Sequence, residues 1–125
     1  MSPRMWIIVG AVFGALAVGT GAFGAHALKE RLEETGKSET YEIAVRYQMY
    51  HALALVLVGL VGLQMPAPSL NVAGLCFTVG IVVFSGLLYP LALGGPKIFG
   101  AIVPIGGLSF IAGWLVLATA AFAKK

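Results

Sequence analysis

The sequence has little charge. Charged residues make up 10% of its 125 residues, and aspartate is absent. Soluble domains carry about 25% charged residues. Hydrophobic residues make up 59%, and the mean hydropathy is +0.95, which is more apolar surface than so short a soluble fold can bury. The composition therefore excludes an ordinary soluble domain. It predicts one all-α domain, residues 1–125, with the lipid bilayer as its main partner.

Other scarce residue types exclude whole classes of function. The one cysteine, Cys76, cannot form an intrachain disulfide, and with two histidines it leaves a zinc site underfilled. No basic run exceeds Lys124-Lys125, so the net charge of +3 does not indicate a nucleic-acid partner. No carboxylate lies in the middle of an apolar segment, which argues against a proton-coupled drug antiporter. The sequence favours a protein without enzymatic activity or cofactor.

Long uncharged segments predict four transmembrane helices at about 5–27, 45–64, 70–93 and 98–122. Each segment has about the 20 residues that a bilayer core requires. Pro66 and Pro68 separate the second helix from the third, and short connections predict an antiparallel four-helix bundle. We expect the first segment to be a retained helix and not a cleaved signal peptide, because the uncharged stretch from Met5 to Leu28 is long for a signal.

The segment from Lys29 to Arg46 holds nine of the thirteen charged residues. We expect it to be an amphipathic connector that lies at the membrane interface, with one helical turn ending at Gly36 and a new helix capped by Ser38. Together with Lys97 it carries five positive residues, against three at the other end: Arg4, Lys124 and Lys125. The excess predicts a cytoplasmic connector and two periplasmic termini.

Small residues recur four apart in the first span, as in Gly10-x3-Gly14 and Ala11-x3-Ala15-x3-Gly19. Such stripes let helix backbones approach closely. They predict either packing within the bundle or a homo-oligomer formed through the first helix.

Polar residues gather where the connector meets the membrane, and they form the candidate ligand-binding set: His26, Arg46, Tyr47, Gln48, Tyr50 and His51. The two histidines flank the same connector, with His51 deeper by roughly 9 Å. They could ligate a haem, bind a quinone or lipid headgroup together with Arg46, relay protons, or only hydrogen-bond the first two helices to each other. In each case we expect His51 to contact His26 or a polar group of the first helix.

The tyrosines and tryptophans, including the two tyrosines of the candidate set, also have a simpler interpretation. Tyrosine and tryptophan mark membrane–water boundaries, and we expect this of Tyr41, Tyr47 and Tyr50, and of Tyr89, Trp6 and Trp114 at other levels.

Three motifs resemble a known family. They are the run from Gly21 to Leu28 (GAFGAHAL), the run from Tyr47 to Leu55 (YQMYHALAL), and Gly106-Gly-x-x-Phe-x-x-Gly-Trp114. They resemble the small membrane proteins of the domain of unknown function 423, to which vertebrate transmembrane protein 256 is similar. The resemblance implies a four-span protein of the bacterial inner membrane and no reaction.

Three functions therefore stay open from the sequence. The leading interpretation is a structural or interaction protein of the bacterial envelope. The alternative is a binding or transport protein for a lipid or small amphiphile near His26, Arg46 and His51. A haem-binding redox subunit is a lesser alternative.

Overall fold

The computed structural model describes residues 1–123, and these form helices and short connections without a strand. The first helix, α1 (Pro3–Ala25), is capped by Ser2, whose hydroxyl accepts a hydrogen bond from the Met5 amide. A short helix, α2 (Lys29–Thr35), ends at Gly36 with φ of 70°, a left-handed conformation that glycine adopts without strain. Lys124 and Lys125, which the orientation prediction counts, lie outside the described residues.

The second long helix, α3 (Ser38–Gln64), begins earlier than the predicted span, because it absorbs the second half of the connector. Ser38 is its first residue, and its cap is Lys37, without a side-chain hydrogen bond. The prediction that Ser38 caps this helix is therefore wrong. Glu39 lies in the first turn, near the positive end of the helix dipole.

The third long helix changes its winding in the middle. It consists of α4 (Ser69–Gly80), the π-helical segment η1 (Ile81–Ser85) and α5 (Gly86–Ala92). The Gly86 amide donates a hydrogen bond to the Ile81 carbonyl, five residues earlier, which is the spacing of a π-helix. Just beyond, Pro90 has no amide hydrogen to donate to the preceding turn. The fourth long helix, α6 (Ile98–Ala123), follows a turn in which Gly94 has φ of 101°.

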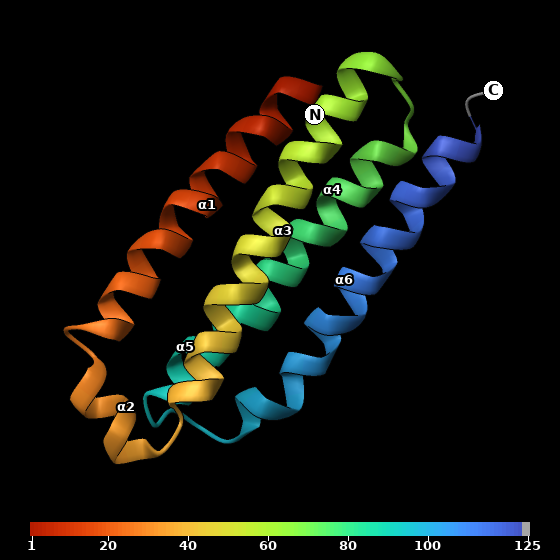
Figure 1. The fold of residues 1–125 in the computed structure, drawn as a ribbon. Helices are drawn as coiled ribbons and strands as arrows, with labels where there is room; N and C mark the ends of the chain where they lie inside the picture. Colours follow the sequence, from red (N-terminus) through yellow and green to blue (C-terminus); the bar gives the residue numbers. More distant parts are fainter. Residues whose placement is uncertain (124–125) are drawn as a thin grey trace.

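The helices form an antiparallel bundle (Figure 1) in which α3 and the α4–α5 helix lie between α1 and α6. α1 packs mainly on α3, and α6 packs mainly on α4 and η1. Within residues 1–123, four helices are long and apolar enough to cross a membrane. The prediction of an all-helical, four-span bundle is confirmed. Helices embedded in a membrane imply contact with the lipid bilayer, and large apolar side chains such as Leu53, Val82 and Leu115 are exposed on the bundle surface.

The main core lies between the long helices and includes Trp6, Leu55, Val58, Phe77 and Phe110. Trp6 is 2% exposed, and its indole donates to Asn71 Oδ1 at 2.8 Å. Trp6, which the sequence predicts to mark the membrane boundary, lies near the start of α1, where a polar partner on α4 lets its indole be buried. Tyr41, for which the same position is predicted, is also buried.

Candidate functional site

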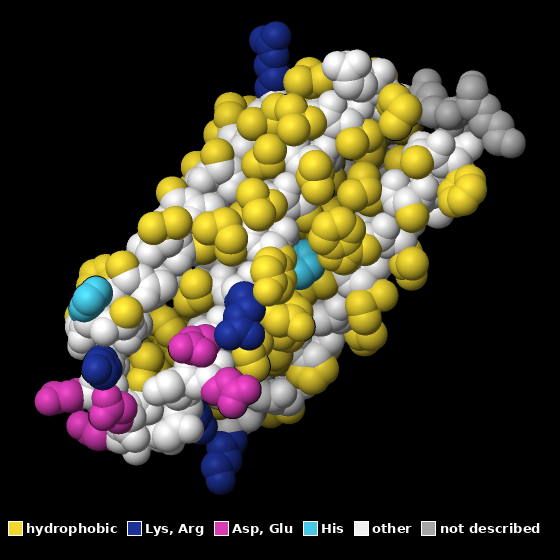
Figure 2. Space-filling view, viewed as in Figure 1, with side chains coloured by type: hydrophobic (Ala, Val, Ile, Leu, Met, Phe, Trp, Pro, Cys, Tyr) yellow, Lys and Arg dark blue, Asp and Glu magenta, His cyan; other side chains and the backbone are white. Residues whose placement is uncertain are grey.

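The two histidines lie apart. His26 is the exposed C-cap residue of α1, whereas His51 is 5% exposed. Gly14 packs beside Ala52, and His26 lies twelve residues beyond Gly14, so roughly 18 Å of helix rise separate the two levels. The two histidine side chains are also separate on the face shown in Figure 2. The structure therefore does not bring His26 and His51 together.

Both ring nitrogens of His51 are hydrogen-bonded within the protein. The indole Nε1 of Trp114 donates to His51 Nε2 at 3.1 Å, and His51 Nδ1 lies 2.7 Å from the Tyr47 carbonyl oxygen. Because an indole N–H only donates and a carbonyl only accepts, the ring is neutral with its proton on Nδ1. Coordination of haem iron or protonation at Nε2 would break the bond to Trp114.

His51 belongs to an aromatic cluster formed by α3, α4, η1 and α6. Its ring stacks on Phe110 with centroids 3.5 Å apart and an interplanar angle of 9°, and the cluster is completed by Tyr47, Phe77, Phe84 and Trp114. The prediction that His51 contacts the first helix is wrong. From Gln48 to His51 the helix turns about 300°, which is about 60° short of a full turn. That offset directs His51 toward α6.

Residues other than the two histidines form the hydrogen bonds between α1 and α3. Gln48 Nε2 donates to the Phe13 carbonyl of α1 at 2.9 Å, and the Tyr41 hydroxyl donates to the Thr20 carbonyl at 2.5 Å. Tyr89 of α5 joins this network, since its hydroxyl donates to Gln48 Oε1 at 2.6 Å and lies 3.0 Å from Thr20 Oγ1. The sequence predictions omitted Thr20. Its signal was its polarity, because a polar side chain in a span needs a partner.

A pocket of about 460 Å³ opens between the end of α1, α2 and the start of α3. Its walls are mainly apolar, from Gly21, Gly24, Ala25, Leu32, Val45 and the Tyr41 ring, and its polar rim consists of Lys29, Glu33, Ser38, Glu42 and Arg46. Figure 2 shows charged side chains gathered at this end of the molecule. Of the six predicted site residues only Arg46 lines the pocket. Tyr47 and Tyr50 are exposed and do not line it.

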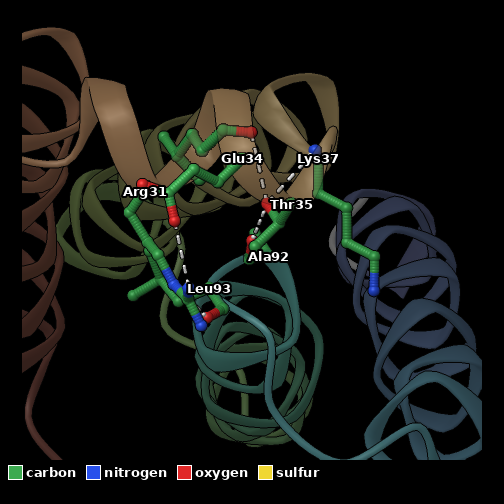
Figure 3. A network of polar contacts seen from close by, with 7 residues as sticks. Arg31, Glu34, Thr35, Lys37, Ala92 and Leu93 are labelled. Carbon is green, nitrogen blue, oxygen red and sulfur yellow. Dashed lines mark hydrogen bonds and ion pairs between the residues drawn. The ribbon is translucent and has the colours of Figure 1, made fainter.

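α2 is held in place as one wall of this pocket. The Thr35 hydroxyl donates to the Ala92 carbonyl at 2.8 Å, and Arg31 Nε donates to the Leu93 carbonyl at 3.1 Å (Figure 3). Both acceptors lie at the C-terminal end of α5, where carbonyls lack partners within the helix and a cation is favourable. Arg31 also pairs with Glu34 at 3.4 Å. The polar contacts thus fix α2 against a helix distant in sequence.

The outward stripe of α3 changes character near the pocket. Its exposed residues are first polar and then apolar: Glu39, Glu42, Arg46 and Tyr50, followed by Leu53, Leu57 and Leu60. Gly21 packs beside Val45, so Arg46 is about one helical turn, roughly 6 Å, from the end of α1. Arg46 therefore lies where the exposed face of α3 changes from polar to apolar side chains.

Comparisons with known proteins agree with this architecture. The family model described as protein of unknown function DUF423 matches residues 20–107. No solved structure matches the chain significantly.

Three similar relatives are named UPF0382 membrane proteins. The relative from Staphylococcus haemolyticus is 48% identical over 95% of this chain and 96% of its own. One from Staphylococcus epidermidis is 50% identical over 94% of each chain. One from a bovine strain of Staphylococcus aureus is 44% identical over 95% of this chain and 96% of its own. The four-span helical bundle, the family match and these near full-length identities show that the chain belongs to the DUF423 family of multi-pass membrane proteins.

Proposed function

We propose that this protein binds a lipid or a small amphiphile in the pocket between α1, α2 and α3. The observation that carries the proposal is the division of the pocket into an apolar wall and a charged rim. An amphiphile has the matching division, since its chain is apolar and its headgroup is polar. The pocket volume of about 460 Å³ is in the range of about 300–1,000 Å³ usual for small-molecule sites.

The depth of the pocket supports a membrane ligand. Arg46 lies where the α3 stripe changes from charged residues to leucine, which is the level of lipid headgroups. A long arginine side chain can keep its charge in that layer while its stem packs on apolar surface. Lys29 reaches the same pocket from α2. Two cations at the headgroup level favour a ligand that contains phosphate or carboxylate.

The test is retention of lipid by the purified protein. We expect native mass spectrometry to find lipid bound to the wild type in mild detergent. Arg46→Gln should lower the apparent affinity about fivefold, the effect of losing one partly exposed charge pair of about 1 kcal/mol. Lys97→Gln is the matched control, because Lys97 is exposed and does not line the pocket. Equal loss in both variants, or no lipid on the wild type, would contradict the proposal.

A structural or interaction role in the envelope is the second candidate, and one surface of α1 favours it. The two small-residue stripes of α1 face different surroundings. Gly10 packs against α3, whereas Ala11, Ala15 and Gly19 are exposed. A second copy could pack closely on that outward stripe. Gly19→Ile should then abolish a dimer detected by cross-linking in membranes, while Val18→Ile, on an exposed neighbour, should leave it intact. Absence of a wild-type dimer would remove this candidate.

The proposal places the protein in the bacterial inner (plasma) membrane with the pocket on the cytoplasmic side and both termini periplasmic. The positive residues of the connector and Lys97 support this orientation. Accessibility labels on engineered single cysteines near residues 2 and 33, in a Cys76→Ala background, test it. Labelling of position 2 from outside the cell and of position 33 only after lysis is expected, and the reverse pattern would overturn the orientation.

A further inference from the structure

The charges around the pocket are balanced. α2 contributes Lys29 and Glu33, and α3 contributes Glu42 and Arg46, so each helix supplies one cation and one carboxylate four residues apart. The rim charge therefore sums to zero. From this arrangement we infer that the pocket takes a zwitterionic headgroup with one phosphate and one primary ammonium group, an inference that rests on the proposed function.

The state of the four charges supports a zwitterion over an anion. Arg46 and Glu42 lie 3.7 Å apart and form an ion pair. Among residues 1–123, neither Lys29 nor Glu33 forms an ion pair. One cation and one carboxylate are thus available to a ligand at the same rim. A headgroup with only negative charge would satisfy Lys29 and be repelled by Glu33 and Glu42.

The aromatic content of the pocket distinguishes the kind of ammonium. Quaternary ammonium groups, which have no N–H, are recognised by cages of aromatic rings. This pocket has one aromatic side chain, Tyr41, and its hydroxyl already donates to the Thr20 carbonyl. Carboxylates instead accept hydrogen bonds from a primary ammonium, which has three donors. Glu33, the carboxylate available to a ligand, therefore matches an ethanolamine-type headgroup and not a choline-type one.

The occupant is a lipid and not a free phosphate ester. The wall below the rim is formed by Gly21, Gly24, Leu32 and Val45, and a soluble headgroup compound has no apolar part to cover it. An acyl chain that enters the pocket between the end of α1, α2 and the start of α3 can cover this wall. Burial of that chain adds a hydrophobic contribution that the headgroup alone lacks.

The experiment titrates the full chain in detergent with phosphatidylethanolamine, phosphatidylglycerol and phosphatidylcholine of identical acyl chains, read by native mass spectrometry. We expect phosphatidylethanolamine to bind most tightly. Glu33→Gln should weaken its binding about fivefold and leave phosphatidylglycerol unchanged or tighter. Glu39→Gln, an exposed carboxylate outside the pocket, is the control and should change neither. Phosphoethanolamine without acyl chains should not compete at equal concentration.

The outcomes separate this inference from the proposed function. If phosphatidylglycerol or phosphatidylcholine binds as tightly as phosphatidylethanolamine, or if Glu33→Gln weakens all three equally, the headgroup assignment is overturned. Sensitivity to Arg46→Gln would then still support an amphiphile site. Competition by phosphoethanolamine as strong as that of the lipid would overturn the lipid as occupant. If no lipid binds in a manner sensitive to Arg46→Gln, the proposed function fails as well.

Discussion

α3 meets α1 and α6 in opposite ways. On α1 it packs through glycine, as where Gly10 leaves no room for a Cβ beside the Ala52 carbonyl. On α6 it packs through large rings, with His51, Phe110 and Trp114 filling the space between the helices. The α1 contact is therefore close and uses backbone acceptors, while the α6 contact is wider and uses side chains. From this difference we expect α3 to tolerate different substitutions on the side that faces α1 and on the side that faces α6.

The largest effect is expected where the backbones are closest. A Cβ on Gly10 would lie 2.6 Å from the Ala52 oxygen, so Gly10→Leu must push α1 away from α3. Overpacking of this kind costs about 3 kcal/mol of unfolding free energy, measurable by denaturation in mixed micelles. In the described part of the chain, a Cβ on Gly19 would meet no atom within 4 Å. Gly19→Leu should therefore be near neutral, and equal losses would contradict the close-packing argument.

The next largest effect is expected at the hydrogen bonds between α3 and its neighbours α1 and α5. Gln48→Leu removes the bonds to the Phe13 carbonyl and the Tyr89 hydroxyl. At about 0.6 kcal/mol per bond in membranes, we expect a loss of about 1 kcal/mol in unfolding free energy. A double-mutant cycle with Tyr89→Phe should give a coupling of about 0.6 kcal/mol. A coupling of zero would mean that Gln48 and Tyr89 do not bond in the membrane.

A smaller effect is expected on the aromatic side. His51→Phe keeps a flat ring against Phe110 and loses two bonds, the one from Trp114 and the one to the Tyr47 carbonyl. The Tyr47 carbonyl still accepts a backbone bond within the helix, so the Trp114 bond dominates the loss. The expected loss is about 0.6 kcal/mol, and the cycle with Trp114→Phe should be coupled. The cycle of His51→Phe with Gln48→Leu should be additive, because the two residues have separate partners. Coupling between the two substitutions would mean that the α1-facing and α6-facing sides of α3 do not act independently.

The smallest effect concerns His26. His26→Ala changes an exposed cap residue, and surface changes of this kind stay within about 0.5 kcal/mol. Its effect should add to that of His51→Phe in denaturation measurements, because the residues are far apart. A non-additive pair would restore the hypothesis that the two histidines act together.

The number and type of the spans could be predicted because apolar length and charge placement are local properties of the sequence. The α2 helix and its end at Gly36 could be predicted for the same reason. Which face of a helix meets which neighbour could not be predicted. Gln48 and His51 are three residues apart, yet an offset of about 60° sends one to α1 and the other to α6.

The candidate site was predicted only in part for a related reason. Arg46 belonged to the candidate set predicted from sequence alone, but Lys29 and Glu33 reach the same pocket only because α2 folds back on the bundle. That fold depends on Arg31 and Thr35 meeting carbonyls at the end of α5. The Thr35 bond joins residues 57 positions apart and the Arg31 bond joins residues 62 positions apart. Contacts so distant in the sequence produce no local pattern from which they could be predicted. The π-helical winding of η1 was also not predicted, since Ile81–Ser85 differs little in composition from its neighbours.

The anchoring of α2 to the end of α5 has a consequence for biosynthesis. Arg31 and Thr35 leave the ribosome well before their acceptors, Leu93 and Ala92. At about 5–20 residues per second, the delay is roughly 3–12 s, during which α1 and α3 can already be inserted and paired. α2 then has no docking place until the third span has crossed the membrane. Completion of the pocket wall is therefore a late step of assembly, and a nascent chain stopped before Ala92 would carry α1 and α3 without a closed pocket.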